Sequence, residues 1–148
     1  MKQEQVQKFD LLAPEREKWI RRNHYYYREQ RRYFQFLVPE GRSVLELGCG
    51  TGDLLDALKP SRGVGIDLSG AMLEQARRKF PHLEFRQTDI EVLEAWGETF
   101  DVIVLSDVIG HLQDIEIVLK RIKHFCRPDT RIVISYYNFL WEPVLRLG

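Results

Sequence analysis

Three glycines at alternate positions, with acids around them, are the residues whose types and spacing indicate chemistry. Gly48, Gly50 and Gly52 follow a short apolar run that contains Glu46, and Asp53 opens a helical pattern directly after them. Glycine accepts conformations that turn the chain sharply, and its missing Cβ leaves room for a ligand. The free N–H groups at the start of the following helix then face that ligand. The sequence therefore predicts a binding site centred on this strand-to-helix loop.

The spacing of the loop narrows the class of ligand. A P-loop ends in Gly-Lys-Ser/Thr, whereas Asp53 and Leu54 follow Gly52 here. A dinucleotide fingerprint requires Gly or Ala three positions beyond Gly50, and Asp53 occupies that position. An acid at the start of a helix would also repel a pyrophosphate. The loop predicts a ligand with a nucleoside but no phosphates, which counts against an NAD-binding oxidoreductase.

Two further acids follow later apolar runs. A carboxylate at Asp67 can accept hydrogen bonds from both hydroxyls of a ribose, or it is a turn acid ahead of Ser69 and Gly70. Asp89 can accept a proton from an adenine amino group, or it caps a helix that begins at Glu91. The two roles of Asp89 need different side-chain directions, and both remain open from the sequence.

A candidate acid-base pair, Asp107 and His111, comes after the next apolar run. His111 has a pKa near neutrality and can take a proton from an oxygen or nitrogen nucleophile. Alternatively, His111 contacts Gln113-Asp114 or caps the next helix. Asp107 carries the same two interpretations. No His, Cys and Asp residues have the spacing of metal ligands, so no metal is predicted.

Short apolar runs alternate with helical patterns from residue 43 onward. This alternation predicts a doubly wound, mostly parallel α/β sheet, in which ligands bind beyond the carboxyl ends of the strands. The runs end close to the acids named above, which places them at one edge of the predicted sheet. The expected strands cover 44–47, 63–67, 83–86, 100–105 and 131–137, and the expected helices cover 53–58, 70–80, 91–96 and 115–125.

The first 42 residues form a separate helical segment in this interpretation. Residues 1–13 are expected to be a short helix or a mobile arm. Pro14 begins a helix that continues to Leu37 and is broken by Pro39-Glu40-Gly41. We therefore divide the chain into an N-terminal helical cap or lid, residues 1–42, and a cofactor-binding domain, residues 43–148.

Composition and length set the broad class. The 148 residues suit one domain, and 22 Lys plus Arg balance 22 Asp plus Glu, so net charge does not favour nucleic acid. Basic residues between Arg16 and Arg32 are more typical of a solvated helix face than of an RNA site. Cys49 and Cys126 form no disulfide pattern, and no apolar run has the ~20 residues of a membrane span. We expect a cytoplasmic protein with no membrane partner.

The end of the chain predicts further structure. Trp141-Glu142-Pro143 resembles the start of another helix, yet the sequence stops at Gly148. An uncovered edge strand invites pairing. We therefore expect a fragment or truncated protein that lacks the last strands of its fold, and we consider a homodimer formed through the uncovered edge.

Four linked motifs resemble those of the class I S-adenosylmethionine-dependent methyltransferases. They are Glu46-Leu47-Gly48-Cys49-Gly50-Thr51-Gly52, Gly65-Ile66-Asp67-Leu68-Ser69, Thr88-Asp89-Ile90 and Phe100-Asp101-Val102-Ile103-Val104. The resemblance covers about residues 43 to 137, in order and at ordinary spacing. It implies a Rossmann-like methyltransferase fold and S-adenosylmethionine as the methyl donor, with S-adenosylhomocysteine as its product.

The resemblance also implies roles for individual residues. The glycine loop packs under the methionyl part of the cofactor, Glu46 organises its amino group, and Asp67 holds the ribose. Leu68 borders the adenine, Asp89 and the Ile90 backbone read the adenine edge, and the backbone near Ser106 faces the ammonium. The implied cofactor-binding residues are Glu46, Gly48, Cys49, Gly50, Gly52, Asp67, Leu68, Met72, Asp89, Ile90 and Ser106.

The resulting hypothesis is methyl transfer by in-line displacement to an unidentified small-molecule acceptor. In related methyltransferases a helix before the first strand covers the site, which makes Tyr26 or Tyr27 candidate contacts. Three successive tyrosines on a helix point in different directions, so Tyr25, Tyr26 and Tyr27 cannot all line one pocket. The alternative is a non-catalytic S-adenosylmethionine- or nucleoside-binding module, or an incomplete fragment of a larger enzyme.

Overall fold

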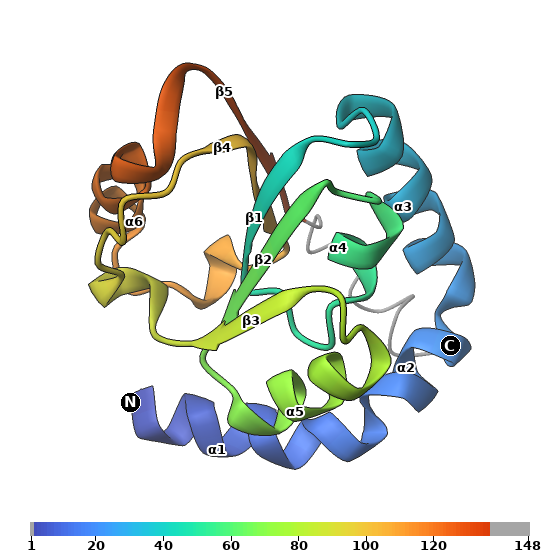
Figure 1. Cartoon of the computed structure of the whole chain (residues 1–148). Helices are drawn as coiled ribbons and strands as arrows, with labels where there is room; N and C mark the ends of the chain where they lie inside the picture. The colour runs from blue at the N-terminus through green and yellow to red at the C-terminus, as the bar shows by residue number, and fades with distance from the viewer. Residues whose placement is uncertain (1, 137–148) are drawn as a thin grey trace.

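The computed structural model describes residues 2–136, and four helical segments precede the sheet. Helix α1 packs beside α5, the helix between the second and third strands, as Figure 1 shows. Helix α3 packs against one face of the sheet through the buried side chain of Phe34, and Val38, directly after the helix, is buried in the same core. The segments are α1 (Lys2–Leu12), a 3₁₀ helix (Ala13–Glu15), α2 (Arg16–Arg22) and α3 (His24–Leu37).

Five strands form one parallel sheet in the order β3-β2-β1-β4-β5. The order reverses between β1 and β4, which is the switch point where ligands bind in doubly wound sheets. The predicted fold class is confirmed. The strands are β1 (Ser43–Leu47), β2 (Arg62–Asp67), β3 (Glu84–Gln87), β4 (Phe100–Ser106) and β5 (Cys126–Ser135).

Helices cover both faces of the sheet (Figure 1). Successive residues of a strand point to opposite faces, so Val44 belongs to one core and Leu45 to the other. Because both cores are apolar, the central strands are continuous apolar runs, as in parallel sheets generally. The first core contains side chains of α3, α4 (Asp53–Ala57) and α5 (Gly70–Lys79), and the second contains those of α6 (Ile115–Ile122) and the 3₁₀ helices Ile90–Val92 and Lys123–Phe125.

The single helix expected from Pro14 to Leu37 is divided in the structure. Asn23 leaves the helical conformation, with φ −101° and ψ 33°, between α2 and α3. Its side-chain Nδ2 donates to the Trp19 carbonyl oxygen at 3.1 Å. Asparagine competes in this way with the helical hydrogen bonds of the backbone, which is the reason for the break. The division lets α2 and α3 take different directions.

Two further element predictions need correction. The helix expected over residues 91–96 is a single 3₁₀ turn at Ile90–Val92, which is capped by Asp89. The last strand begins at Cys126 rather than Arg131, because Cys126 already pairs with Phe100 before an irregularity in the ladder. The predicted strand residue Tyr137 and the predicted helix start at 141–143 lie outside the described residues.

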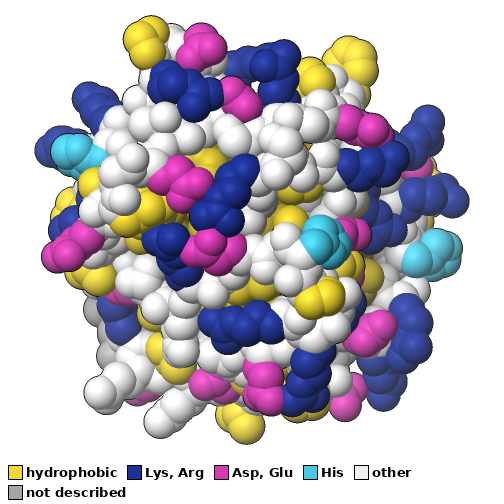
Figure 2. Space-filling view, in the orientation of Figure 1, with side chains coloured by type: hydrophobic (Ala, Val, Ile, Leu, Met, Phe, Trp, Pro, Cys, Tyr) yellow, Lys and Arg dark blue, Asp and Glu magenta, His cyan; other side chains and the backbone are white. Residues whose placement is uncertain are grey.

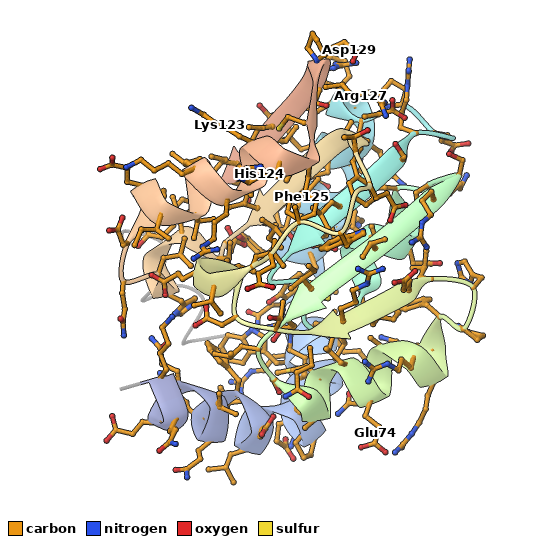
Figure 3. All side chains as sticks on the ribbon, turned by 60° about the vertical axis from the view of Figure 1, so that its left-hand side comes forward. Glu74, Lys123, His124, Phe125, Arg127 and Asp129 are labelled. Carbon is orange, nitrogen blue, oxygen red and sulfur yellow. The ribbon has the colours of Figure 1, made fainter. Side chains whose placement is uncertain are left out.

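Within residues 2–136, no helix combines the length and the apolar character that crossing a membrane requires. Figure 3 shows Arg127 and Asp129, at the start of β5, at the opposite end of the sheet from α1. The carboxyl ends of the strands, which carry the predicted acids, lie toward α1.

Candidate functional site

A cavity of about 590 Å³ lies at the carboxyl ends of the strands, between the sheet and helices α1 to α3. This volume is in the range of small-molecule sites. Almost all predicted site residues line it. They are Glu46, Gly48, Cys49, Gly50, Asp67, Leu68, Met72, Asp89, Ile90, Ser106, Asp107 and His111, and only Gly52 of the predicted set is not part of its wall.

The glycine loop has the positive φ angles that its composition predicted, between 53° and 80°. The space beside each glycine is occupied differently. A Cβ on Gly48 would lie 2.6 Å from Val108, and one on Gly52 would lie 2.8 Å from Phe85. A Cβ on Gly50 would have no atom of the described residues within 4 Å. The missing side chains of Gly48 and Gly52 therefore accommodate Val108 and Phe85, and only Gly50 of the three leaves open space.

Asp67 connects the glycine loop to the start of α5. One carboxylate oxygen accepts from the Gly50 backbone N–H at 2.7 Å, and the other accepts from the Ser69 N–H at 2.9 Å. Burial raises the pKa of Asp67, and these hydrogen bonds offset part of the rise. The turn role considered from the sequence is present. The carboxylate also lines the cavity, and each oxygen retains a further acceptor position.

Glu46 is the acid of β1 and is almost completely buried. Its Oε2 atom has no hydrogen-bond partner among the described residues. Burial raises the pKa of Glu46 well above its ordinary value, and the nearby Asp67 and Asp53 raise it further. A buried carboxylate oxygen without a partner is costly. Its position on the cavity wall fits a cationic group bound there.

Asp89 follows β3, and its side chain caps the 3₁₀ turn after it. Its Oδ1 accepts from the Glu91 backbone N–H at 2.9 Å, as in the capping role considered from the sequence. Lys2 of α1 forms an ion pair with Asp89 and another with Glu91, the latter at 2.8 Å. The acid predicted to face an adenine is thus in contact with the N-terminal helix.

Asp107 follows β4 with a left-handed backbone, φ 54°. Its Oδ2 accepts from the Tyr26 hydroxyl at 2.6 Å and from Gln30 Nε2 at 2.7 Å. Gln30 also donates to the Ser106 hydroxyl at 3.0 Å. Two residues one turn apart on α3 therefore hold the tip of β4. Sequence reasoning missed Gln30, although its i, i+4 spacing from Tyr26 places both on one helix face.

His111 lies in the 3₁₀ helix Ile109–His111 and faces α1. Its ring contacts Phe9 edge to face, with centroids 5.4 Å apart, and its carbonyl accepts from Gln5 Nε2 at 3.3 Å. Burial lowers the pKa of His111, the positive charge of Lys8 lowers it further, and Asp107 raises it. His111 does not cap the next helix.

The cap of α6 is Asp114. Its Oδ1 accepts from the backbone N–H groups of Glu116 and Ile117, at 2.9 and 3.1 Å. The capping alternative for His111 is therefore wrong, because an acid three positions later occupies the cap.

Helices α2 and α3 contribute a second wall, of which the sequence analysis named only Tyr26 or Tyr27 as candidate contacts. Arg16, Trp19, Ile20, Tyr27 and Arg31 all line the cavity. The Arg16 guanidinium donates to the Tyr27 hydroxyl at 3.1 Å and lies 5.3 Å from the centre of its ring. Tyr26 and Tyr27 line the cavity while the neighbouring Tyr25 is exposed, so the three tyrosines do not share one pocket.

The thiol of Cys49 is buried in the loop, and burial raises its pKa well above the ordinary value. A thiol in this state is a poor nucleophile. Among residues 2–136, no three His, Cys, Asp or Glu side chains are grouped closely enough to hold a metal ion.

A family model described as a methyltransferase domain matches residues 19–146, most of the chain. The chain belongs to this family. The motifs, the strand order and the cavity at the switch point agree with the class I S-adenosylmethionine-dependent methyltransferases, and S-adenosylmethionine is the cofactor of this class. The resemblance inferred from four motifs is confirmed.

This methyltransferase domain is similar to several known proteins. It is 28% identical over 131 residues, or 80% of its length, to a demethylmenaquinone methyltransferase of Lactobacillus johnsonii. The DhpI–SAH complex superimposes on 89% of this chain and 67% of its own, with a TM-score of 0.78 and 20% identity, which is a likeness of fold. A Thermotoga maritima S-adenosylmethionine-dependent methyltransferase, a possible histamine N-methyltransferase, covers 82% of this chain and 56% of its own, with a TM-score of 0.72 and 25% identity.

The match covers only part of the length of these relatives. The chain spans 54% of the Lactobacillus enzyme and about half the length of the curated relatives it matches.

Proposed function

We propose that this methyltransferase domain binds S-adenosylmethionine in the cavity and transfers its methyl group to a small-molecule acceptor by in-line displacement. The observation that carries the proposal is that Glu46, Asp67, Asp89 and Asp107, at the carboxyl ends of β1, β2, β3 and β4, line one cavity. The name of the Lactobacillus relative refers to a small molecule, demethylmenaquinone, which supports an acceptor of this size.

The residues of the cavity fit this cofactor. The Oε2 atom of Glu46, buried and without a hydrogen-bond partner, suits an ammonium group. Asp67 retains acceptor positions for ribose hydroxyls, and Gly50 leaves open space beside it. The excess of carboxylates opposes a pyrophosphate, which disfavours NAD.

We assign the remaining contacts from their positions on the wall. Leu68, Met72, Asp89 and Ile90 all line the cavity. We assign the first two and Ile90 to the faces of the adenine, and Asp89 to its amino group. Ser106 and the loop residues Gly48 and Cys49 line the methionyl end. When bound, S-adenosylmethionine supplies a methyl group on a positively charged sulfur. The protein excludes water and holds the reacting groups in line.

His111 is the proposed general base. Its lowered pKa keeps the imidazole neutral at pH 7, so that it can accept a proton from an oxygen or nitrogen nucleophile. Asp107 is the second proposed catalytic group. The hydrogen bonds from Tyr26 and Gln30 hold its carboxylate in one position, which favours orienting the acceptor over taking its proton.

Residues 1–42 are the proposed lid. Side chains of α1 contact the rest of the site: Lys2 pairs with Asp89 and Glu91, Gln5 donates to the His111 carbonyl, Phe9 contacts the His111 ring, and Asp10 accepts from the Ser69 hydroxyl. Opening these contacts would give the cofactor access to the cavity.

The location, the oligomeric state and the class of acceptor are also proposals. A cytoplasmic location and a homodimer through the β5 edge remain predictions. Basic and acidic side chains are interspersed on the face seen in Figure 2, which favours a small-molecule acceptor over nucleic acid.

Titration calorimetry with S-adenosylmethionine, S-adenosylhomocysteine and NAD tests the proposal. We expect heat of binding from the first two ligands and none from NAD. Methylation of an acceptor by the same preparation would support the enzyme, whereas binding without turnover on any acceptor would favour the non-catalytic module. Binding of NAD alone would refute the assignment.

A further inference from the structure

The helical wall of the cavity carries an arrangement that the cofactor contacts do not use. Arg16, Trp19, Ile20, Tyr27 and Arg31 form it, and all five come from α2 and α3. Tyr27 and Arg31 are one turn apart on the same face of α3. Arg16 contacts Tyr27 through its hydroxyl and its ring. The two guanidinium groups therefore belong to one wall of the cavity, together with the side chains of Trp19, Ile20 and Tyr27.

Neither guanidinium forms an ion pair with an acid among the described residues. Within residues 2–136, Arg31 is half-buried and makes no hydrogen bond or ion pair, and Arg16 donates only to the neutral Tyr27 hydroxyl. The other cations around the cavity are neutralised: Lys2 pairs with Asp89 and Glu91. Glu15, next to Arg16, pairs with Lys18 at 3.5 Å.

An arginine removed from water without an anion is costly, and its planar fork matches an oxyanion. We propose that Arg16 and Arg31 bind a carboxylate or phosphate group of the methyl acceptor, so that the substrate is an anionic molecule with an apolar or aromatic body. This inference rests on the proposed function, because it names the substrate class of the same site. The aromatic and aliphatic side chains of Trp19, Ile20 and Tyr27 suit that body.

The rival source of an oxyanion is the cofactor itself, which has a carboxylate at its amino-acid end. The positive charge of Arg16 also acts on a strand-tip acid, since it lowers the pKa of Asp67 against the effect of burial. The acceptor is the better occupant, because both guanidiniums come from the helical wall, which also carries Trp19, Ile20 and Tyr27, whereas the predicted site of the cofactor's ammonium group lies at Glu46 on the strand tips.

Matched probes test the proposal on protein saturated with S-adenosylhomocysteine. Benzoate, phenylphosphonate and benzamide share one ring and differ in the charged group, and hexanoate and hexanamide repeat the comparison without the ring. We expect an anion to bind about tenfold or more tightly than its neutral amide in titration calorimetry. Preference for benzoate over phenylphosphonate would assign a carboxylate acceptor, and the reverse would assign a phosphate or phosphonate.

Variants connect that preference to the two residues. Arg31→Gln and Arg16→Gln should each remove most of the preference, and Arg22→Gln, on the exposed side of α2, should keep it. If no anion binds more tightly than its amide, or if Arg31→Gln keeps the preference, the proposal is wrong.

A second comparison separates the two sources of the oxyanion. 5′-Methylthioadenosine lacks the amino-acid end of S-adenosylhomocysteine. A tenfold loss of S-adenosylhomocysteine affinity in Arg31→Gln, with 5′-methylthioadenosine unchanged, would assign the pair to the cofactor's carboxylate and overturn the proposal. Failure of the wild-type protein to bind S-adenosylhomocysteine would instead refute the proposed function.

Discussion

The two walls of the cavity differ in charge and in the way their side chains are held. The strand tips carry Glu46, Asp67, Asp89 and Asp107, which are placed by the sheet and by hydrogen bonds with the backbone. The helical wall carries aromatic residues and the two arginines, and it meets the strand tips mainly through side chains, such as the Tyr26 hydroxyl on Asp107. One cavity thus presents an acidic surface for a cation opposite a basic and apolar surface for an anion.

The largest expected effect lies on the strand tips. Asp67→Ala should weaken binding of S-adenosylmethionine by about 1–3 kcal/mol, or roughly 5- to 150-fold, because a charged hydrogen-bond acceptor is lost. Titration calorimetry measures the change. Adenosine should lose affinity as well, and 2′,3′-dideoxyadenosine should not.

A control is needed because Asp67 also supports the glycine loop. Ser69→Ala removes the cap of α5, which accepts from the Met72 N–H at 3.2 Å, and leaves the carboxylate in place. It should retain cofactor affinity. Equal losses for adenosine and its dideoxy analogue in Asp67→Ala would show that the ribose assignment is wrong.

The second expected effect concerns stability without a ligand. The raised pKa of Glu46 means that its burial is favourable below the ordinary value of 4.5 and becomes unfavourable as pH rises toward the raised value. Glu46→Gln should therefore stabilise the ligand-free protein at pH 7 by about 1 kcal/mol, while it weakens cofactor binding. Urea unfolding at pH 5, 6 and 7 measures the difference, which should shrink at the lower pH.

The pKa of Glu84 is shifted in the opposite direction to that of Glu46. Arg62 holds the pKa of Glu84 low, so its contribution is present above the ordinary value and is lost as pH falls through the lowered one. Glu84→Gln should destabilise slightly at neutral pH. If Glu46→Gln also destabilises the ligand-free protein, the interpretation of Glu46 as an unsatisfied acid fails.

The smallest expected effect lies where α1 meets His111. Lys8→Gln should raise the pKa of His111 by only a small amount, because it removes an exposed, screened positive charge. An NMR titration of the imidazole measures this shift, with His111→Asn to assign the signal. Lys123→Gln, beyond the far end of α6 in Figure 3, should leave it unchanged. A shift of the same size in both variants would argue against contact of α1 with His111.

Much of the strand wall could be predicted from the sequence, because its information is local. An apolar run followed by glycine or an acid marks the end of a buried strand, and parallel strands bring their carboxyl ends to one edge. For this reason Glu46, Asp67, Asp89 and Asp107 can be identified from the sequence alone. The choice between capping and ligand binding at Asp89 was not local, since it depended on the direction of one side chain.

Much less of the helical wall could be predicted from the sequence. The break at Asn23, which lets α2 and α3 take separate directions, was hidden in a helical pattern, and the pairing of Gln30 with Asp107 joins residues far apart in the chain. Arg16 and Arg31 looked like members of a solvated basic face, because a helix pattern does not reveal which side meets the sheet.

The sequence by itself determined the doubly wound sheet, its family and the acids at its strand tips, since periodicity and turn residues act over a few neighbours. Only the tertiary structure decided which helix face closes the cavity and which charged groups stay unpaired, because burial and pairing depend on contacts between segments far apart in the chain.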